Sequence, residues 1–169
     1  MEETMEKYIH LAKKLNMVNA RIISPQEISF DIRAILKCRW GCEYSLQENV
    51  RCHNRDTTHQ ERVEMVKRYQ HILLVHSHDA RELSAAVLEI ERTAFLDGYY
   101  LAFAIRTCNL CQICAVKQGD PCPTPEKVRP CDSSFGIDVY KTARNLGLPC
   151  EVLQLKDDVQ NRYGFVLLD

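Results

Sequence analysis

The sequence lacks an excess of charge of either sign, because its 22 lysines and arginines are balanced by 23 aspartates and glutamates. Proteins that bind nucleic acids or anionic membranes normally carry a basic excess, so neither kind of partner is expected. An apolar run long enough for a signal peptide or a membrane span is also missing, and residues 1–16 are acidic and then amphipathic. These absences predict a cytoplasmic protein.

Several enzyme signatures are absent as well. The chain has no G-x-G-x-x-G, Walker loop, G-x-S-x-G or H-E-x-x-H pattern, so nothing indicates a nucleotide-binding enzyme, a serine hydrolase or a zinc protease. Whether the protein is an enzyme stays open. With 169 residues and 46% hydrophobic content, the chain is suited to one core, which predicts a single domain over residues 1–169.

Cysteine is abundant, with nine residues in all, five of which lie between positions 107 and 131. Disulfides are rare in a reducing cytoplasm, and an odd number would leave one cysteine unpaired. The clustered cysteines therefore favour metal binding. The isolated Cys150 fits a small buried apolar residue instead.

Hydrophobic spacing divides the chain into helices and strands. We expect helices at about 3–15, 58–69, 79–97 and 137–146, and strands at about 28–36, 71–75, 99–105, 151–155 and 163–168. Thr58 with Glu61, and Asp79 with Glu82, have capping-box spacing. Residues 106–134 lack periodicity and are rich in proline, and a bound metal centre would account for so long an irregular segment. The prediction is an α+β fold: a single domain with a mixed or antiparallel sheet of about four to six strands, packed helices and a long Cys/Pro-rich metal-binding loop.

One cysteine group lies within that loop. Cys108, Cys111 and Cys114 form a C-x2-C-x2-C pattern, and Cys122 follows with Pro123 directly behind it. Three thiolates at this spacing can hold three corners of a 4Fe-4S cluster, with the fourth ligand further along the chain. The pattern is similar to bacterial ferredoxin loops, although the gap before the fourth cysteine is longer. Structural zinc usually takes two separated C-x2-C pairs, so zinc is the alternative and free thiols are a third interpretation.

A second group consists of Cys38, Cys42 and Cys52, whose C-x3-C-x9-C spacing is less specific. We favour Cys131 as its fourth ligand, with a histidine near Cys52 as the alternative. In that arrangement the two groups interleave in space, and two clusters would exchange electrons. Without a fourth thiolate, the open iron would bind substrate or sulfur, and the protein would be an enzyme.

Other side chains near the cysteines carry weaker signals. Histidines His53, His76 and His78 are expected to be exposed or hydrogen-bonded and are not first-choice ligands. Trp40 and Tyr44 would either shield a cluster or pack in the core. The basic residues around the two groups would raise a reduction potential, mark a docking face or belong to a solvated loop. They are Arg39, Arg51, Arg55, Lys117, Lys127 and Arg129.

Three segments together carry a family resemblance. "KCRWGCEYSLQENVRC", "DGYYLAFAI" leading into "CNLCQICAVKQGDPCPTPEKVRP", and "SSFGIDVYKTARNLGL" resemble, in order and spacing, the predicted metal-binding proteins catalogued as domain of unknown function 2284. The resemblance covers the chain from about Arg33 to its C-terminus. It implies metal binding through both groups, and it assigns no activity. The residues to which this carries over are Cys38, Cys42, Cys52, Cys108, Cys111, Cys114 and Cys122.

Two departures from the family pattern concern the second group. Relatives usually have Cys-Pro-Pro where this chain has Cys52, His53 and Asn54, and Cys131 stands where relatives often have a residue that cannot bind metal. The fourth ligand of this group is therefore expected to differ from that of its relatives.

The leading hypothesis is a cytoplasmic iron-sulfur protein with one or two 4Fe-4S clusters that transfers electrons to a redox partner protein. The alternatives are an enzyme with an open iron site and a binding module stabilised by zinc. The predicted metal ligands are Cys38, Cys42, Cys52, Cys108, Cys111, Cys114, Cys122 and Cys131.

Overall fold

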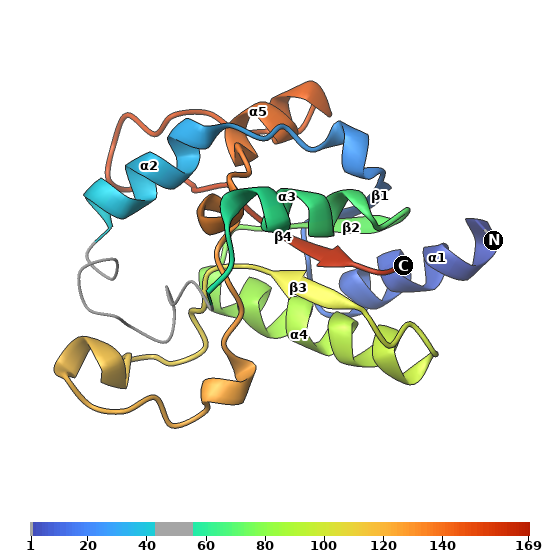
Figure 1. The fold of residues 1–169 in the computed structure, drawn as a ribbon, viewed down its shortest axis with the longest axis horizontal. Helices are drawn as coiled ribbons and strands as arrows, with labels where there is room; N and C mark the ends of the chain where they lie inside the picture. The colour runs from blue at the N-terminus through green and yellow to red at the C-terminus, as the bar shows by residue number, and fades with distance from the viewer. Residues whose placement is uncertain (1, 43–55) are drawn as a thin grey trace.

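The computed structural model describes residues 2–42 and 56–169. Its four strands form one central sheet, and its helices lie around that sheet, as Figure 1 shows. In chain order they are α1 (Glu2–Lys14), β1 (Asn19–Ile23), α2 (Ile32–Gly41), α3 (His59–Lys67), β2 (Ile72–Ser77), α4 (Ala80–Leu96), β3 (Phe103–Ile105), α5 (Val139–Asn145) and β4 (Arg162–Leu167). In the part of the chain described, every helix is too short or too polar to cross a lipid bilayer.

The sheet is antiparallel, with the strand order β1-β2-β4-β3. Because β4 lies between β2 and β3 and runs opposite to both, β2 and β3 are parallel to each other. Their carboxyl ends therefore lie at the same edge of the sheet. The chain passes from β3 at this edge directly into the cysteine-rich residues 106–134, so the sheet positions the start of the candidate site.

Alternate residues of the strands enter two separate cores. On one side, Leu73 and Val75 of β2 pack with apolar residues of α1 and α4. On the other side, Ile72 and Leu74 pack with residues of α3 and α5. Figure 1 shows α1 and α4 below the sheet and α3 and α5 above it, which makes three layers. Helix α2 lies on the upper side and contacts the short 3-10 helix Asp132–Phe135 (η5).

The predicted α+β fold with an antiparallel sheet is confirmed, and most of its helices are where we expected them. The predicted helices at 3–15, 58–69, 79–97 and 137–146 correspond to α1, α3, α4 and α5. At the start of α3, Thr58 and Glu61 form the predicted capping box, in which the backbone N–H of Thr58 donates to Glu61 Oε2 at 2.7 Å. Asp79 caps α4 by accepting from the backbone N–H of Glu82 at 2.8 Å.

The strand predicted at 28–36 is wrong, because its second half belongs to α2. Asp31 caps this helix, since its side chain accepts a hydrogen bond from the backbone N–H of Arg33 at 2.8 Å. Strand-like pairing here is an isolated bridge between Phe30 and Ile137. The apolar alternation that suggested a strand is already broken at Ile35, which is the buried residue of α2. A strong N-cap therefore outweighed a short alternating pattern.

Two further strand predictions differ from the structure, and one strand of the structure was not predicted. Residues 151–155 form no strand and are exposed, because no other strand pairs with them. The apolar run 99–105 is a strand only over Phe103–Ile105. Strand β1 was not predicted, because its five residues include the polar Asn19 and Arg21.

Residues 106–134 contain no α-helix or strand, as the proline content predicted. Three short 3-10 helices interrupt this segment or follow it. They are Ala115–Gln118 (η3), Pro125–Lys127 (η4) and η5. That this segment binds a metal stays a prediction.

Candidate metal centre

The start of the cysteine-rich segment is fixed by two hydrogen bonds to the backbone of Thr107. Directly after β3, the carbonyl oxygen of Thr107 accepts a hydrogen bond from Ser84 Oγ of α4 at 3.1 Å. The side chain amide of Asn109 donates to the same oxygen, also at 3.1 Å. Because Ser84 is buried within α4, these bonds tie Cys108 to a rigid part of the fold.

The first candidate site, which we call the loop cavity, is a cleft of about 680 Å³ within residues 106–128 and beside β4. The chain returns toward its own start here because η3 ends at Gly119, whose φ of 86° suits glycine. Two arginines, Arg106 and Arg162, also line this cleft and place positive charge beside it. The cysteines that line the loop cavity are Cys108, Cys111, Cys114 and Cys122.

The second candidate site, which we call the helix cavity, is a cleft of about 830 Å³ between α2, the end of β3 and η5. Cys38 and Cys42 are one helical turn apart at the end of α2, where the backbone N–H of Cys42 donates to the carbonyl of Cys38 at 3.0 Å. The cysteines that line the helix cavity are Cys38, Cys42, Cys108 and Cys131. Cys108 therefore borders both cavities.

Cys131 is held at the base of the helix cavity by hydrogen bonds to its sulfur. The backbone N–H of Ser134 donates to Cys131 Sγ at 3.3 Å. A hydrogen bond with the Cys38 side chain is the largest of the effects that lower the pKa of the Cys131 thiol to about 7, while burial opposes the shift. A lowered pKa favours the thiolate, which is the form of cysteine that binds metals.

A buried arginine of α3, Arg62, contacts the chain close to Cys131. The side chain of Arg62 is 6% exposed, and its Nη1 donates to the carbonyl of Ser134 at 2.6 Å. Its Nε donates to Thr57 Oγ1 at 2.9 Å. The positive charge of Arg62 attracts the Cys131 thiolate electrostatically. No sequence pattern connects Arg62 to Cys131, because α3 and η5 meet only in the folded chain.

The structure brings the predicted ligands together in two places, and their assignment as ligands stays a prediction. Cys131 lines the same cavity as Cys38 and Cys42, whereas Cys52 lies outside the described residues. Among the residues described, no three His, Cys, Asp or Glu side chains already form a metal-binding arrangement, and the eight described cysteines form no disulfide. Cys150 is buried at 6% exposure, as an apolar residue would be.

Neither cavity is lined by the predicted histidines or the predicted tryptophan that the structure describes. His76 is buried, shares a hydrogen bond of 2.9 Å between its Nε2 and Asn161 Oδ1, and stacks on Tyr163. His78 is exposed. Trp40 is 90% exposed, so the prediction that it packs in the core is wrong, and the prediction that it shields a cluster stays a prediction. Four further residues named in the sequence analysis fall outside the described residues: Tyr44, Arg51, His53 and Arg55.

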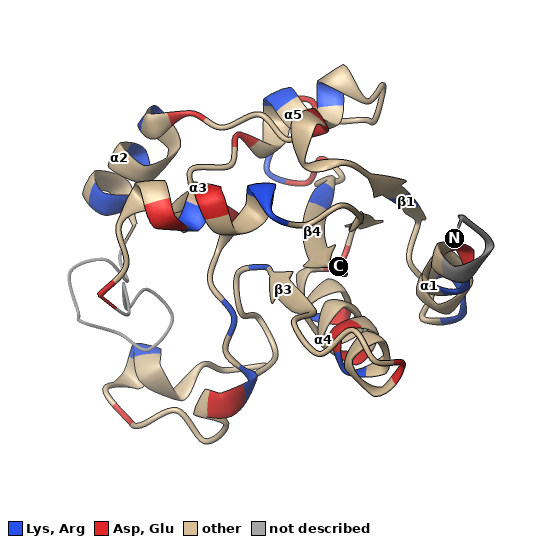
Figure 2. Ribbon diagram, turned by 45° about the vertical axis from the view of Figure 1, so that its right-hand side comes forward, with Lys and Arg blue, Asp and Glu red and all other residues tan. Residues whose placement is uncertain are grey.

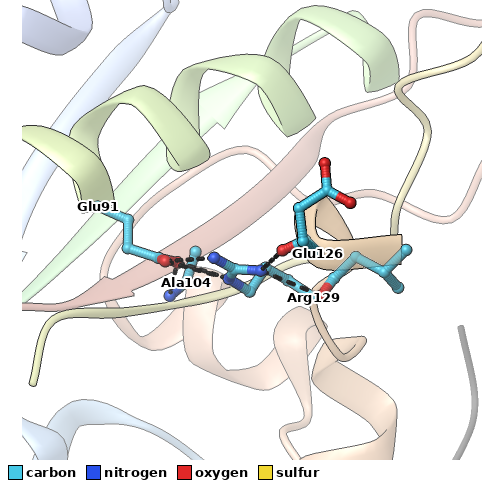
Figure 3. A network of polar contacts seen from close by, with 5 residues as sticks. Glu91, Ala104, Glu126 and Arg129 are labelled. Carbon is cyan, nitrogen blue, oxygen red and sulfur yellow. Dashed lines mark hydrogen bonds and ion pairs between the residues drawn. The ribbon is translucent and has the colours of Figure 1, made fainter. Parts of the chain in front are cut away.

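Arg129, one of the predicted basic loop residues, is paired with a carboxylate (Figure 3). Its Nη2 lies 2.5 Å from Glu91 Oε1 of α4, and its Nε donates to Glu91 Oε2 at 2.8 Å. The same Oε2 accepts from the backbone N–H of Ala104 at 2.7 Å, on the outer edge of β3. Glu91 therefore joins the end of the cysteine-rich segment to a helix and a strand. Arg39, Lys117 and Lys127 are exposed.

Comparison with known proteins gives one result. The family model described as a predicted metal-binding protein (DUF2284) matches residues 21–168, a range that includes both cavities. No curated protein and no solved structure matches the chain.

Proposed function

The chain belongs to the DUF2284 family of predicted metal-binding proteins, and we propose that it is an iron-sulfur protein that transfers electrons to a partner protein. One observation carries this proposal. The C-x2-C-x2-C cysteines and Cys122 line a single cleft at the edge of the sheet. Four sulfur donors from one loop are the ligand set that 4Fe-4S clusters use.

The residues of the loop cavity suit an anionic cluster. We propose Cys108, Cys111, Cys114 and Cys122 as the ligands of a first 4Fe-4S cluster. A cluster with four thiolates is negatively charged, and Arg106 and Arg162 on the cleft wall would compensate that charge. Cys111 is exposed, so the distance for electron transfer from the cluster to a docked protein would be short.

The helix cavity would hold a second cluster. We propose Cys38, Cys42 and Cys131 as three of its ligands and Cys52 as the fourth. The lowered pKa of the Cys131 thiol supports a thiolate ligand at neutral pH. Because Cys108 borders both cavities, the two clusters would lie side by side. When bound, such clusters exchange single electrons at potentials between about −700 and +450 mV.

Metal analysis after anaerobic purification tests this proposal. We expect iron and acid-labile sulfide in equal amounts, together with a brown colour that bleaches with dithionite. Stoichiometric zinc without acid-labile sulfide would contradict the proposal and support a zinc-stabilised binding module, which chelators would unfold. Fractionation of the cells that produce the protein tests our expectation of a cytoplasmic location.

One observation favours an enzyme as the second candidate function. The helix cavity is about 830 Å³ and is lined by charged side chains, among them Arg33, Lys37 and Asp132, beside its cysteines. Such groups would bind a small polar substrate at an iron with an open coordination position. In this case Cys131→Ala leaves the iron content unchanged and impairs turnover, whereas a structural ligand is lost together with its cluster.

A further inference from the structure

Helix α2 exposes three large apolar side chains along one line. They are spaced four residues apart, so they lie on the same side of the helix. Ile32 is 51% exposed, Leu36 is 46% exposed and Trp40 is 90% exposed. Single exposed apolar residues are common on protein surfaces, but a contiguous stripe that ends in a tryptophan is typical of an interaction site. We call these three residues the outer stripe of α2.

Basic residues flank the outer stripe on both sides. At 100° per residue, Arg33 and Lys37 fall on the flank that also borders the helix cavity, and Arg39 falls on the other flank. All three are exposed. The ten residues of α2 include no aspartate or glutamate, and Figure 2 shows blue but no red along this helix. The acidic cap Asp31 pairs with Arg33 at the start of the helix, whereas Lys37 and Arg39 lie nearer to Trp40 in the sequence.

The opposite side of the same helix belongs to the candidate metal centre. Ile35 is buried there, and Cys38 lines the helix cavity. An α-helix with its side chains is about 10–12 Å across. A protein bound to the outer stripe would therefore be one helix away from the proposed second cluster.

We propose that the outer stripe of α2 and its basic flanks form the docking site for an acidic electron-transfer protein, a step that rests on the proposed function. Trp40 would enter an apolar depression on that partner. Lys37 and Arg39 would meet carboxylates at its rim. The basic flanks distinguish this occupant from a second copy of the chain, because a symmetric dimer through α2 would place two sets of like charges together.

The sole tryptophan of the chain makes the test direct. Trp40 is the one tryptophan in the sequence, so labelling with 5-fluorotryptophan gives a single ¹⁹F signal from the docking site. The labelled protein, purified anaerobically, is titrated at low salt with two small acidic electron carriers, an oxidised plant-type ferredoxin and a flavodoxin. We expect the signal to shift on binding and the affinity to fall as salt is raised.

Matched variants separate docking from general surface effects. Leu36→Ser and the double variant Lys37→Glu/Arg39→Glu should each weaken binding at least about tenfold. Leu155 is 71% exposed and Lys156 is also exposed, and both lie outside α2. Leu155→Ser and Lys156→Glu should therefore bind as the unmodified protein does. Circular dichroism checks that each variant is folded.

Three results would overturn the docking site. The first is a ¹⁹F signal that shifts with neither carrier. The second is an equal loss of binding in the α2 variants and in their controls. The third is a ¹⁹F signal that shifts only with vesicles that contain phosphatidylserine. Sedimentation of the protein alone as a dimer that Trp40→Ala dissolves would assign the stripe to a second copy. Iron and sulfide content of the same samples tests the proposed function separately, so intact clusters without docking would reject this inference alone.

Discussion

A hydrogen bond joins the side chains of Cys38 and Cys131, two residues that are far apart in the sequence. Cys38 lies on α2, and Cys131 precedes η5. Both line the helix cavity. The contact therefore places Cys131 beside the second cysteine group, and it makes Cys131 the most informative cysteine to replace.

Replacing Cys131 should remove one of the two proposed clusters. We expect Cys131→Ala to keep about half of the iron and sulfide of the unmodified protein, since the loop cavity retains its own four cysteines. Cys150 is buried away from both cavities, so Cys150→Ala should keep all of the iron. Iron and acid-labile sulfide analysis gives the answer. Full iron in Cys131→Ala would show that Cys131 is not a ligand.

Glu91 and Arg129 should contribute measurably to stability. Their side chains are 13% and 22% exposed, and Glu91 also accepts a hydrogen bond from the edge of β3. We expect Arg129→Met to lower the free energy of unfolding by about 2–4 kcal/mol, because it leaves a largely buried carboxylate without its partner. Arg92→Met removes an exposed pair with Glu89 and should cost less than about 1 kcal/mol. Urea denaturation measures both, and equal losses would contradict the prediction.

Gly136 should tolerate no side chain. Its φ is +73°, and a Cβ placed there would lie 2.5 Å from Cε1 of His59. We expect Gly136→Ala to lower the free energy of unfolding by about 2–4 kcal/mol, since backbone strain and overpacking add. Gly147 has a similar φ of +69° with no atom nearby, so Gly147→Ala should cost about 1–2 kcal/mol. A Gly136→Ala protein as stable as the Gly147→Ala protein would argue against close packing between α3 and η5.

His76 should make the fold sensitive to acid. Burial is the main cause that lowers the pKa of His76 below its ordinary value, so the folded protein favours the neutral ring. The unfolded chain takes up a proton near pH 6.5, before the folded protein does. Stability from this residue is therefore complete above about pH 6.5 and decreases as the pH falls through the interval between the two pKa values.

Denaturation at pH 7.5 and pH 5.5 measures this effect. We expect His76→Phe to lose less stability between these two pH values than the unmodified protein does, whatever its stability at pH 7.5. His10 on α1 is exposed and is not among the groups that shift the pKa of His76, so His10→Gln should keep the full pH dependence. An unchanged pH dependence in His76→Phe would assign the acid sensitivity to other groups.

The sequence by itself determined the helices α1, α3, α4 and α5 and the irregular course of residues 106–134. The signals for these features are local: a capping box such as Thr58 with Glu61 and an apolar spacing of three to four residues act within one or two helical turns. The repeat of cysteines from Cys108 to Cys122 is local in the same sense, and in the structure these cysteines line one cavity within a single loop.

Only the tertiary structure decided the strands and the partners of each cysteine. A strand needs a neighbour to satisfy its backbone hydrogen bonds, so residues 151–155 remain outside the sheet, whereas β1, which has the same number of polar residues, pairs with β2. Cys131 meets Cys38 because α2 packs on η5. Trp40 faces solvent because Ile35 and Cys38 occupy the inner side of the same helix. Each of these outcomes depends on which surfaces meet when the chain folds, and spacing along the sequence does not specify that.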